Sequence, residues 1–291
     1  MLLRWLCLVG VLTTVSSYPI KTTKKRFPSA IIIGAKKAGT RALLEFLRLN
    51  PLIKAPGPEV HFFDKSFDKG LDWYRERMPE TNGDQLTIEK SPAYFHSKNA
   101  PERIKALDPN MKLILVVRDP VTRAISEYTQ ASTKKRRLGQ MPSFEEMTTG
   151  DCSSWLKANC SDKVNGVNAN WGAIKIGVYH RYLTRWLKHF PLEQIHIVDG
   201  ERLITDPEKE VADTEKFLGL TPVVKATDFG VDPVKNFPCI RKTDNKLHCL
   251  GKTKGRKHPN VSPGVLDTLR NFYAAENEKF YRMINRHFHW Q

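Results

Sequence analysis

The stretch Ala30-Ile31-Ile32-Ile33-Gly34-Ala35-Lys36-Lys37-Ala38-Gly39-Thr40-Arg41 decides the fold of this 291-residue chain. An apolar run rich in isoleucine that stops at a glycine is typical of a buried strand in a parallel sheet. Residues 41–48 then read as a helix, which Pro51 ends. Strand, glycine-containing turn and helix form the opening unit of a nucleotide-binding α/β domain, so the sequence predicts an α/β fold.

The chain downstream of this unit continues the alternation. Further strands are predicted at residues 86–88, 113–117 and 195–198. Helices are predicted at residues 101–107, 171–190, 208–218 and 263–288, and Ser143 with Glu146 fits a capping box. Because strands and helices alternate to about residue 220, we expect a single domain over 29–291 with one central, mostly parallel sheet.

The turn between Gly34 and Arg41 predicts an anion site. Backbone N–H groups point at the ligand from a helix N-terminus, and a lysine adds a full positive charge. The order differs from the G-x-x-x-x-G-K-[ST] phosphate loop, because Lys36 and Lys37 precede Gly39 and Thr40 follows it directly. For this motif alone, a solvated basic turn is the alternative.

A second anion site is predicted where the strand at 113–117 ends in Arg118. If a helix begins near Pro120, Ser126 lies about two turns into it and faces the same crevice as Arg118. Ligands bind at this edge of open α/β sheets, and an arginine with a hydroxyl group is a good clamp for a second phosphate.

The charge of the chain points to a polyanionic partner. Lys and Arg total 47 against 31 for Asp and Glu, a formal charge of +16, while 40% hydrophobic residues exclude a disordered basic tail. Nucleic acid, an acidic membrane and a sulfated polysaccharide all fit this charge.

The N-terminus narrows that choice. Residues 1–17 resemble a secretory signal peptide, with Arg4, an apolar run over 6–15 and small residues before Tyr18. The run is too short for a comfortable span of about 20 residues, and a short uncleaved signal anchor is the alternative. Residues 18–28 then form a basic stem. A luminal address argues against nucleic acid and favours sulfated or carboxylated glycans.

The cysteines agree with an oxidising compartment. Outside the signal lie Cys152, Cys160, Cys239 and Cys249, which allow three pairings. The local pairs 152 with 160 and 239 with 249 are favoured because each closes a short loop. The spacing does not fit a zinc site. Two sequons, at Asn159 and Asn260, predict glycan acceptors.

Six blocks of sequence carry a resemblance to a known family. They are KKAGTRALLEFL at 36–47, EVHFFD at 59–64, EKSPAYF at 89–95, RDPVTRAISEY at 118–128, HIVDGERLITDP at 196–207 and GKTKGRKHP at 251–259. From about residue 28 to Trp290 the chain resembles the heparan sulfate glucosamine 3-O-sulfotransferases. The resemblance implies an α/β fold related to the P-loop kinases, PAPS (3′-phosphoadenosine 5′-phosphosulfate) as donor, and no metal in the chemistry. It implies sulfuryl transfer to the 3-hydroxyl group of glucosamine in heparan sulfate.

The same resemblance assigns the donor site. The 5′-phosphosulfate loop matches Lys37, Ala38, Gly39, Thr40 and Arg41, the 3′-phosphate clamp matches Arg118 and Ser126, and the loop after the disulfide hairpin matches Lys254, Gly255, Arg256, Lys257 and His258. The hairpin itself matches Cys239 and Cys249. Ala38 replaces the first of two glycines that the family has after the lysine. Alanine does not tolerate a positive φ, but it is still small, so we expect donor binding to survive.

The acceptor side is assigned through Glu59, which matches the catalytic base of the family. A carboxylate suits this role, because the sugar hydroxyl must lose its proton as it attacks sulfur. His61 and Asp64 match residues that orient or polarise this group, and Lys37 and Lys90 match lysines near the transferred sulfuryl group and the acceptor. Without the family, Glu59 would read equally well as a solvated loop residue.

Other residues are expected to hold the polymer or to pack in the core. The expected polymer contacts are Gln130, which matches a contact of the family, together with Lys65, Arg123, residues 134–137, Lys175, Arg241 and Trp171. Core packing is the alternative for Trp171. Core positions are expected for Phe62, Phe63, Tyr94 and Phe95.

Two alternatives to this function remain open from the sequence. One is a luminal PAPS-dependent sulfotransferase that acts on another glycan or another position. The other is a heparin-binding protein without catalysis. We expect a monomer of the Golgi lumen, in part secreted, without stable membrane insertion once the signal is cleaved.

Overall fold

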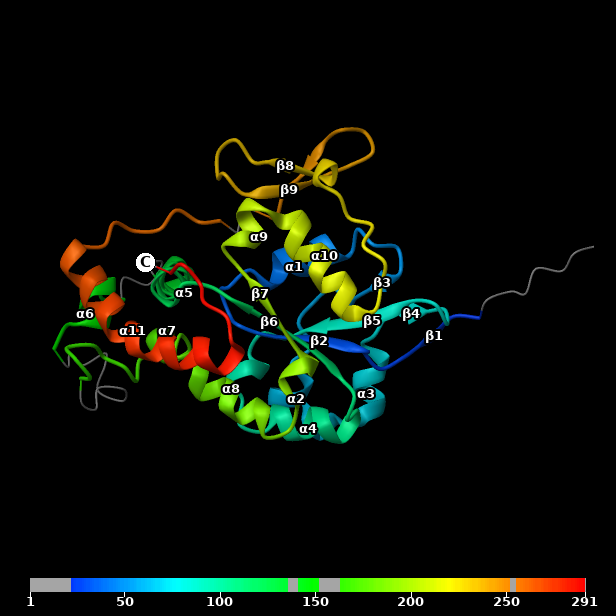
Figure 1. Cartoon of the computed structure of the whole chain (residues 1–291), viewed down its shortest axis with the longest axis horizontal. Coiled ribbons are helices and arrows are strands. Elements are labelled where there is room, and N and C mark those ends of the chain that lie inside the picture. The colour runs from blue at the N-terminus through cyan, green and yellow to red at the C-terminus, as the bar shows by residue number, and fades with distance from the viewer. Residues whose placement is uncertain (1–21, 136–140, 152–162, 252–254, 291) are drawn as a thin grey trace, which may run out of the picture.

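The computed structural model describes residues 22–135, 141–151, 163–251 and 255–290. A five-stranded parallel sheet lies at its centre, in the order β3-β5-β2-β6-β7 (Figure 1). The strands are β2 (Ala30–Gly34), β3 (Ile53–Lys54), β5 (Leu86–Lys90), β6 (Lys112–Val117) and β7 (Ile195–Asp199). The α/β fold with a central parallel sheet is therefore confirmed.

Helices cover both faces of this sheet (Figure 1). Above it in that view lie α1 (Thr40–Leu47), α9 (Arg202–Thr205) and α10 (Pro207–Leu218); below it lie α2 (Phe62–Lys65), α3 (Gly70–Glu76), α4 (Ala100–Leu107) and α8 (Tyr179–Leu187). Isoleucines of β2 and the apolar side chains of β6 are fully buried between these layers. Burial on both faces explains why these strands read as continuous apolar runs rather than alternating ones.

A second apolar cluster lies beside the first one. It packs α5 (Pro120–Lys135), α6 (Phe144–Thr148) and α7 (Gly172–Lys175) against the long helix α11 (Pro263–Ile284). The capping box of α6 is confirmed, since the Ser143 side chain accepts from the Glu146 amide and the Glu146 carboxylate accepts from the Ser143 amide. Asp119 caps α5 by accepting from the amides of Val121 and Thr122.

Two small antiparallel sheets complete the fold. β1 (Lys24–Lys25) pairs with β4 (Glu80–Thr81), and β8 (Phe229–Val231), β9 (Pro238–Arg241) and β10 (Leu247–His248) form a three-stranded lobe. Phe229 packs edge-on against Phe46 of α1 and so attaches this lobe to the main core. Short 3-10 turns lie at Phe67–Lys69, Tyr94–His96, Leu192–Gln194 and Ala226–Asp228. None of the helices in the described ranges is long and apolar enough to span a membrane.

The prediction of one helix over 171–190 is wrong. The structure breaks it between α7 and α8, around Gly177. A Cβ atom at Gly177 would lie 2.8 Å from the Tyr273 hydroxyl oxygen and 2.9 Å from a Pro120 carbon, so the backbone passes close to α11 and α5 there. The C-terminal helix also ends earlier than expected, because Asn285 adopts a left-handed conformation with φ 48°. Beyond it the chain turns back, and Trp290 stacks on Phe288.

Candidate active site

The carboxyl ends of three neighbouring strands place three predicted segments side by side. The phosphosulfate loop follows β2, Lys90 ends β5, and Arg118 follows β6. Because β5, β2 and β6 are adjacent and parallel, these segments meet at one edge of the sheet.

The loop between β2 and α1 has two residues in the left-handed region. Lys37 has φ 72° and Gly39 has φ 114°, whereas Ala38 is not among the described residues with a positive φ. Alanine in place of glycine therefore brings no strain at position 38. Behind the loop, a Cβ atom at Gly200 would lie 2.4 Å from the Ala38 carbonyl oxygen, so this close approach requires glycine at position 200.

The predicted donor residues from three segments converge. Burial lowers the pKa of His258, and the positive charges of Arg118 and Lys37 lower it further, which places the imidazole close to both cations. Glu201 holds Arg118, with a carboxylate oxygen 3.3 Å from the arginine Nε. Burial raises the pKa of Glu201 to about 7 despite the nearby Arg118 charge.

The structure describes all but one of the remaining residues that were predicted to bind the donor. Ser126 is a half-buried residue of α5, and Thr40 is buried at the start of α1. Gly255 adopts φ 61° against Lys235 and Phe237 of the three-stranded lobe, and Arg256 is half-buried while Lys257 is exposed. Lys254 lies outside the described residues.

Arg41 links the donor loop to the segment that carries Glu59. Its guanidinium donates to the Gly57 carbonyl oxygen over 3.0 Å and forms an ion pair of 2.7 Å with Glu45. The sequence places Arg41 in the phosphosulfate loop; the structure adds this contact between the two sides of the site.

Glu59 is the centre of a charged cluster. One carboxylate oxygen lies 2.5 Å from the Lys90 Nζ atom, and the other lies 3.2 Å from Nε2 of His61. The opposite ring nitrogen of His61 lies 3.0 Å from an Asp64 oxygen. The side chain of Lys90 is only 4% exposed. All four residues were predicted from the sequence, and the structure brings them together.

The protonation state of Glu59 follows from this cluster. Burial alone would raise the pKa of the Glu59 carboxyl, but the hydrogen bond and charge of Lys90, with the contribution of His61, bring that pKa below its ordinary value. Glu59 is therefore ionised at neutral pH and can accept a proton.

Arg123 corrects one of the sequence expectations. It was expected to contact a polymer, but it is completely buried. Its guanidinium donates to Glu127 over 2.6 Å, to the Lys36 carbonyl oxygen over 3.3 Å and to the Ala173 carbonyl oxygen. Since a buried arginine needs such partners, Arg123 fastens the loop between β2 and α1 to α5 and α7 rather than facing solvent. Lys36 also pairs with Glu127, over 2.6 Å.

The other expected polymer contacts lie at the surface or near the loop. Lys65, Lys175 and Arg241 are exposed. The amide oxygen of Gln130 accepts from Lys37 over 2.9 Å. Trp171 is half-buried and packs edge-on against Phe144, which is the core alternative for this residue. The side chains of residues 134–137 lie outside those described. Phe62, Phe63, Tyr94 and Phe95 are fully buried, as expected.

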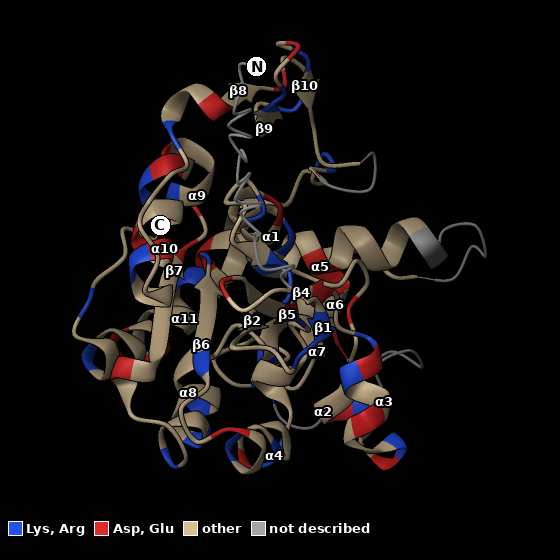
Figure 2. Ribbon diagram, turned by 90° about the vertical axis from the view of Figure 1, so that its right-hand side faces the viewer, with Lys and Arg blue, Asp and Glu red and all other residues tan. Residues whose placement is uncertain are grey.

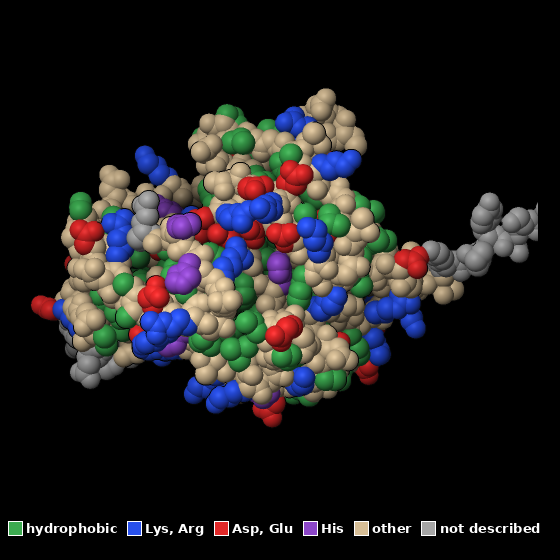
Figure 3. All heavy atoms as spheres, viewed as in Figure 1, with side chains coloured by type: hydrophobic (Ala, Val, Ile, Leu, Met, Phe, Trp, Pro, Cys, Tyr) green, Lys and Arg blue, Asp and Glu red, His purple; other side chains and the backbone are tan. Residues whose placement is uncertain are grey.

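Charges of both signs share the visible surface. Figure 3 shows basic side chains interleaved with acidic ones on one face, and Figure 2 shows both signs along α3. The positive excess of the sequence is therefore not gathered into one continuous basic patch on the face in Figure 3.

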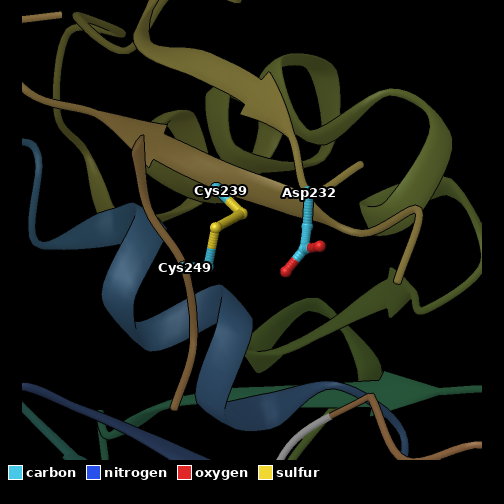
Figure 4. A group of neighbouring side chains, drawn as sticks. All are labelled: Asp232, Cys239 and Cys249. Carbon is cyan, nitrogen blue, oxygen red and sulfur yellow. A yellow bond between two sulfur atoms is a disulfide. The ribbon is translucent and has the colours of Figure 1, made fainter. Parts of the chain in front are cut away.

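The predicted pair Cys239–Cys249 is a disulfide (Figure 4). Asp232 lies beside it, and the three side chains come close enough to suggest a metal site. The sulfur atoms of a disulfide offer no thiolate to a metal ion. The Asp232 carboxylate instead accepts from the amides of Val234 and Lys235. The group is therefore a cross-link next to a capped turn, and it does not fit a metal site. Cys152, Cys160 and Asn159 lie outside the described residues. Asn260 is exposed, and its glycan stays a prediction.

Two residues of the candidate site, Glu89 and Glu201, have no role predicted from the sequence. Glu89 is fully buried on the strand that ends at Lys90, and Glu201 contacts the Arg118 side chain. Strand alternation was an available signal for Glu89, because neighbouring residues of β5 point to opposite faces. Glu201 had no comparable local signal.

Known proteins resemble the chain over most of its length. The sulfotransferase domain model matches residues 27–284. Heparan sulfate glucosamine 3-O-sulfotransferase 3B1 of Mus musculus is 48% identical over 278 residues, which cover 95% of this chain and 68% of that protein. The 3A1 protein of Mus musculus is 49% identical over 268 residues, which cover 91% of this chain and 65% of that protein. The chain thus spans about two thirds of the length of these relatives.

A solved structure supports the same architecture. The sulfotransferase from Alicyclobacillus acidocaldarius matches with a TM-score of 0.64 at 22% sequence identity. The match covers 90% of this chain and 98% of that one. At this identity the likeness shows a common fold.

Proposed function

The chain belongs to the heparan sulfate glucosamine 3-O-sulfotransferase family, and we propose that it transfers a sulfuryl group from PAPS to the 3-hydroxyl group of a glucosamine residue in heparan sulfate. One observation carries the proposal most directly. The ionised Glu59 carboxylate contacts both Lys90 and His61 at the sheet edge where Lys37 and Arg118 lie.

The residues of the donor side suit a nucleotide with anionic groups at two ends. The loop at the N-terminus of α1, with Lys37, offers backbone N–H groups and a cation to one anionic end. Arg118, oriented by Glu201 and close to His258, offers an arginine clamp to the other. PAPS supplies the sulfuryl group when it is bound. We infer that Ser126, Thr40, Arg41 and the loop at 254–258 complete this site.

The proposed reaction is one in-line displacement at sulfur. The sugar 3-hydroxyl oxygen forms a bond to sulfur and its O–H bond breaks, while the bond between sulfur and the phosphate oxygen of the donor breaks. Glu59, which is ionised at neutral pH and open to solvent on one side, accepts the released proton. Lys37 stabilises the negative charge that grows on the leaving oxygen, and His61 with Asp64 orients the carboxylate.

The polymer and the cellular setting belong to the same proposal. Exposed Lys65, Lys175 and Arg241, with Gln130 beside Lys37, are the proposed heparan sulfate contacts among the described side chains. We propose that the enzyme acts as a monomer in the Golgi lumen and that its chemistry needs no metal ion.

Disaccharide analysis of heparan sulfate tests the proposal. The purified chain is incubated with heparan sulfate and isotope-labelled PAPS, and the digested product is compared with 3-O-sulfated standards. We expect label on the glucosamine 3-oxygen. Label at another position would favour a different sulfotransferase activity, and binding of heparan sulfate without any label would favour a non-catalytic protein.

A further inference from the structure

A buried carboxylate lies directly behind the proposed base. Glu89 is fully buried near the end of β5, one residue before Lys90. Neighbouring strand residues point to opposite faces, so Lys90 reaches Glu59 while Glu89 points into the protein toward Tyr74. An unpaired buried carboxylate is costly, which makes its partners informative.

The partners of Glu89 lead to the loop that carries Glu59. The Ser91 hydroxyl donates to a Glu89 oxygen over 2.6 Å, and the same hydroxyl oxygen accepts from the His61 amide over 2.9 Å. The Val60 amide lies close enough to the Glu89 carboxylate to lower its pKa. The Tyr74 hydroxyl completes the set, 3.4 Å from the other oxygen.

Tyr94 continues the same pattern along the loop. Its hydroxyl oxygen accepts from the Phe62 amide over 2.8 Å and from the Phe63 amide over 3.4 Å. The Tyr94 hydroxyl also lies close enough to the Glu89 carboxylate to lower its pKa. The amides of residues 61–63 therefore donate to side chains of the segment 89–94, and the amide of residue 60 lies close to Glu89. The first amides of α2 have no partner within their own helix, so these side chains supply it.

The backbone at His61 needs such support. Its φ is 53°, a left-handed conformation that is strained for a non-glycine residue. From this position its ring reaches Glu59 on one side and Asp64 on the other. If the amides of residues 60–63 lost their partners, the backbone could relax and both contacts would loosen.

We propose that Glu89 is a positioning residue: through Ser91 and Tyr94 it holds the backbone of residues 60–63 so that Glu59 and His61 keep their mutual geometry. The inference rests on the proposed function, because it takes Glu59 as the base. Glu89 does not touch the reacting atoms and acts only through the loop. Burial raises the pKa of Glu89 to about 7, so glutamine imitates a form that the carboxyl group adopts near neutral pH.

Three variants test this role, with a matched control. Glu89→Ala and Ser91→Ala remove the support, whereas Glu89→Gln keeps a side chain of the same shape. The control is Glu215→Ala on α10, another fully buried carboxylate, which is bonded to Asn50 and Val223 instead. Each protein is measured for kcat, for KM of heparan sulfate, for affinity to 3′-phosphoadenosine 5′-phosphate and for thermal stability.

The expected results separate positioning from general stability. Glu89→Ala and Ser91→Ala should lower kcat by about 100-fold, the order of loss that a misplaced catalytic group causes, with nucleotide affinity unchanged. Glu89→Gln should restore most of kcat. The acid limb of the pH profile should move to higher pH in both alanine variants, because Glu59 loses its contact with His61. Glu215→Ala should lose stability and leave kcat and the pH profile as they are.

Two outcomes would overturn the proposal. One is a kcat and pH profile for Glu89→Ala that match those of Glu215→Ala at equal stability. The other is hydrogen exchange at the amides of residues 60–63 that is equally slow in Glu89→Ala and in the wild-type protein. If Glu89→Ala does not fold, Ser91→Ala and Tyr94→Phe carry the same test. If the wild-type protein transfers no sulfuryl group, the proposed function fails, and hydrogen exchange still decides whether Glu89 holds the loop.

Discussion

The Nζ atom of Lys90 lies 2.5 Å from a carboxylate oxygen of Glu59, a residue 31 positions earlier in the chain. The lysine side chain is almost fully buried, whereas the side chain of Glu59 is 42% exposed. The pair therefore has a fixed, buried cation and a carboxylate that remains open on one side. This arrangement keeps Glu59 ionised and leaves it accessible to a hydroxyl group.

Replacing Glu59 should remove the proton acceptor without disturbing the donor site. Glu59→Gln should reduce turnover by about 100-fold or more, within the range of general base catalysis. The affinity for 3′-phosphoadenosine 5′-phosphate should not change, because the donor residues lie on other segments. Calorimetry and transfer of labelled sulfate check both parts. Near wild-type turnover would contradict the assignment, and Lys216→Ala, at an exposed lysine of α10, is the surface control.

Replacing Lys90 should change how activity depends on pH. The Lys90 cation holds the pKa of Glu59 below its ordinary value, so Lys90→Met should raise that pKa. A higher pKa means that Glu59 becomes protonated at a higher pH, and the acid limb of kcat/KM should move upward. The measurement is a pH profile of both proteins. An unmoved acid limb would show that another group controls it.

Arg123 should matter for stability rather than for polymer binding. Arg123→Met leaves Glu127 without its buried partner and frees the carbonyl oxygens of Lys36 and Ala173. Breaking a buried ion pair costs about 3–5 kcal/mol in the free energy of unfolding. Urea unfolding checks this value against Lys216→Met, a control at an exposed lysine of α10. If Arg123→Met lowered the affinity for heparin and left the free energy of unfolding unchanged, Arg123 would be a polymer contact after all.

The disulfide should stabilise the lobe that lies beside the loop at 255–258. Cys239 and Cys249 are 10 residues apart, and closing a loop of this length stabilises a fold by about 3 kcal/mol. The double variant Cys239→Ser with Cys249→Ser should lose about this much. Because Gly255 packs against Lys235 and Phe237, the KM for PAPS should also rise. An unchanged KM for PAPS would show that the three-stranded lobe does not support the donor site.

Glu89 should make stability depend on pH. Burial raises its pKa in the folded protein from the ordinary value of 4.5 to about 7. Between these values the folded carboxyl keeps its proton while the unfolded one loses it, so the free energy of unfolding falls as the pH rises. Glu89→Gln has no such proton. The stability of the wild type relative to this variant should therefore decline from pH 4.5 to about 7, as measured by thermal unfolding. A flat difference would contradict the raised pKa.

The local parts of the fold were within reach of the sequence. The strand at β2, the turn after Gly34 and the helix from Thr40 follow from neighbouring residues, and so do the capping box at Ser143 and the pairing of Cys239 with Cys249. Each of these features depends on contacts within a few residues, where propensity and periodicity act directly. The prediction of one helix over 171–190 was wrong, because the chain breaks around Gly177. There the backbone packs closely against Tyr273, a residue far along the chain.

The sequence by itself determined an α/β sheet, an anion-binding turn and the residue types of a base and its cations. Only the tertiary structure decided which of these side chains meet. It paired Glu59 with Lys90, buried Arg123 under the loop between β2 and α1, and put Glu89 behind the amides of residues 60–63. The physical reason is that burial and long-range hydrogen bonds depend on which strands pair and which helices pack on them. The neighbours of a residue along the chain do not specify this arrangement.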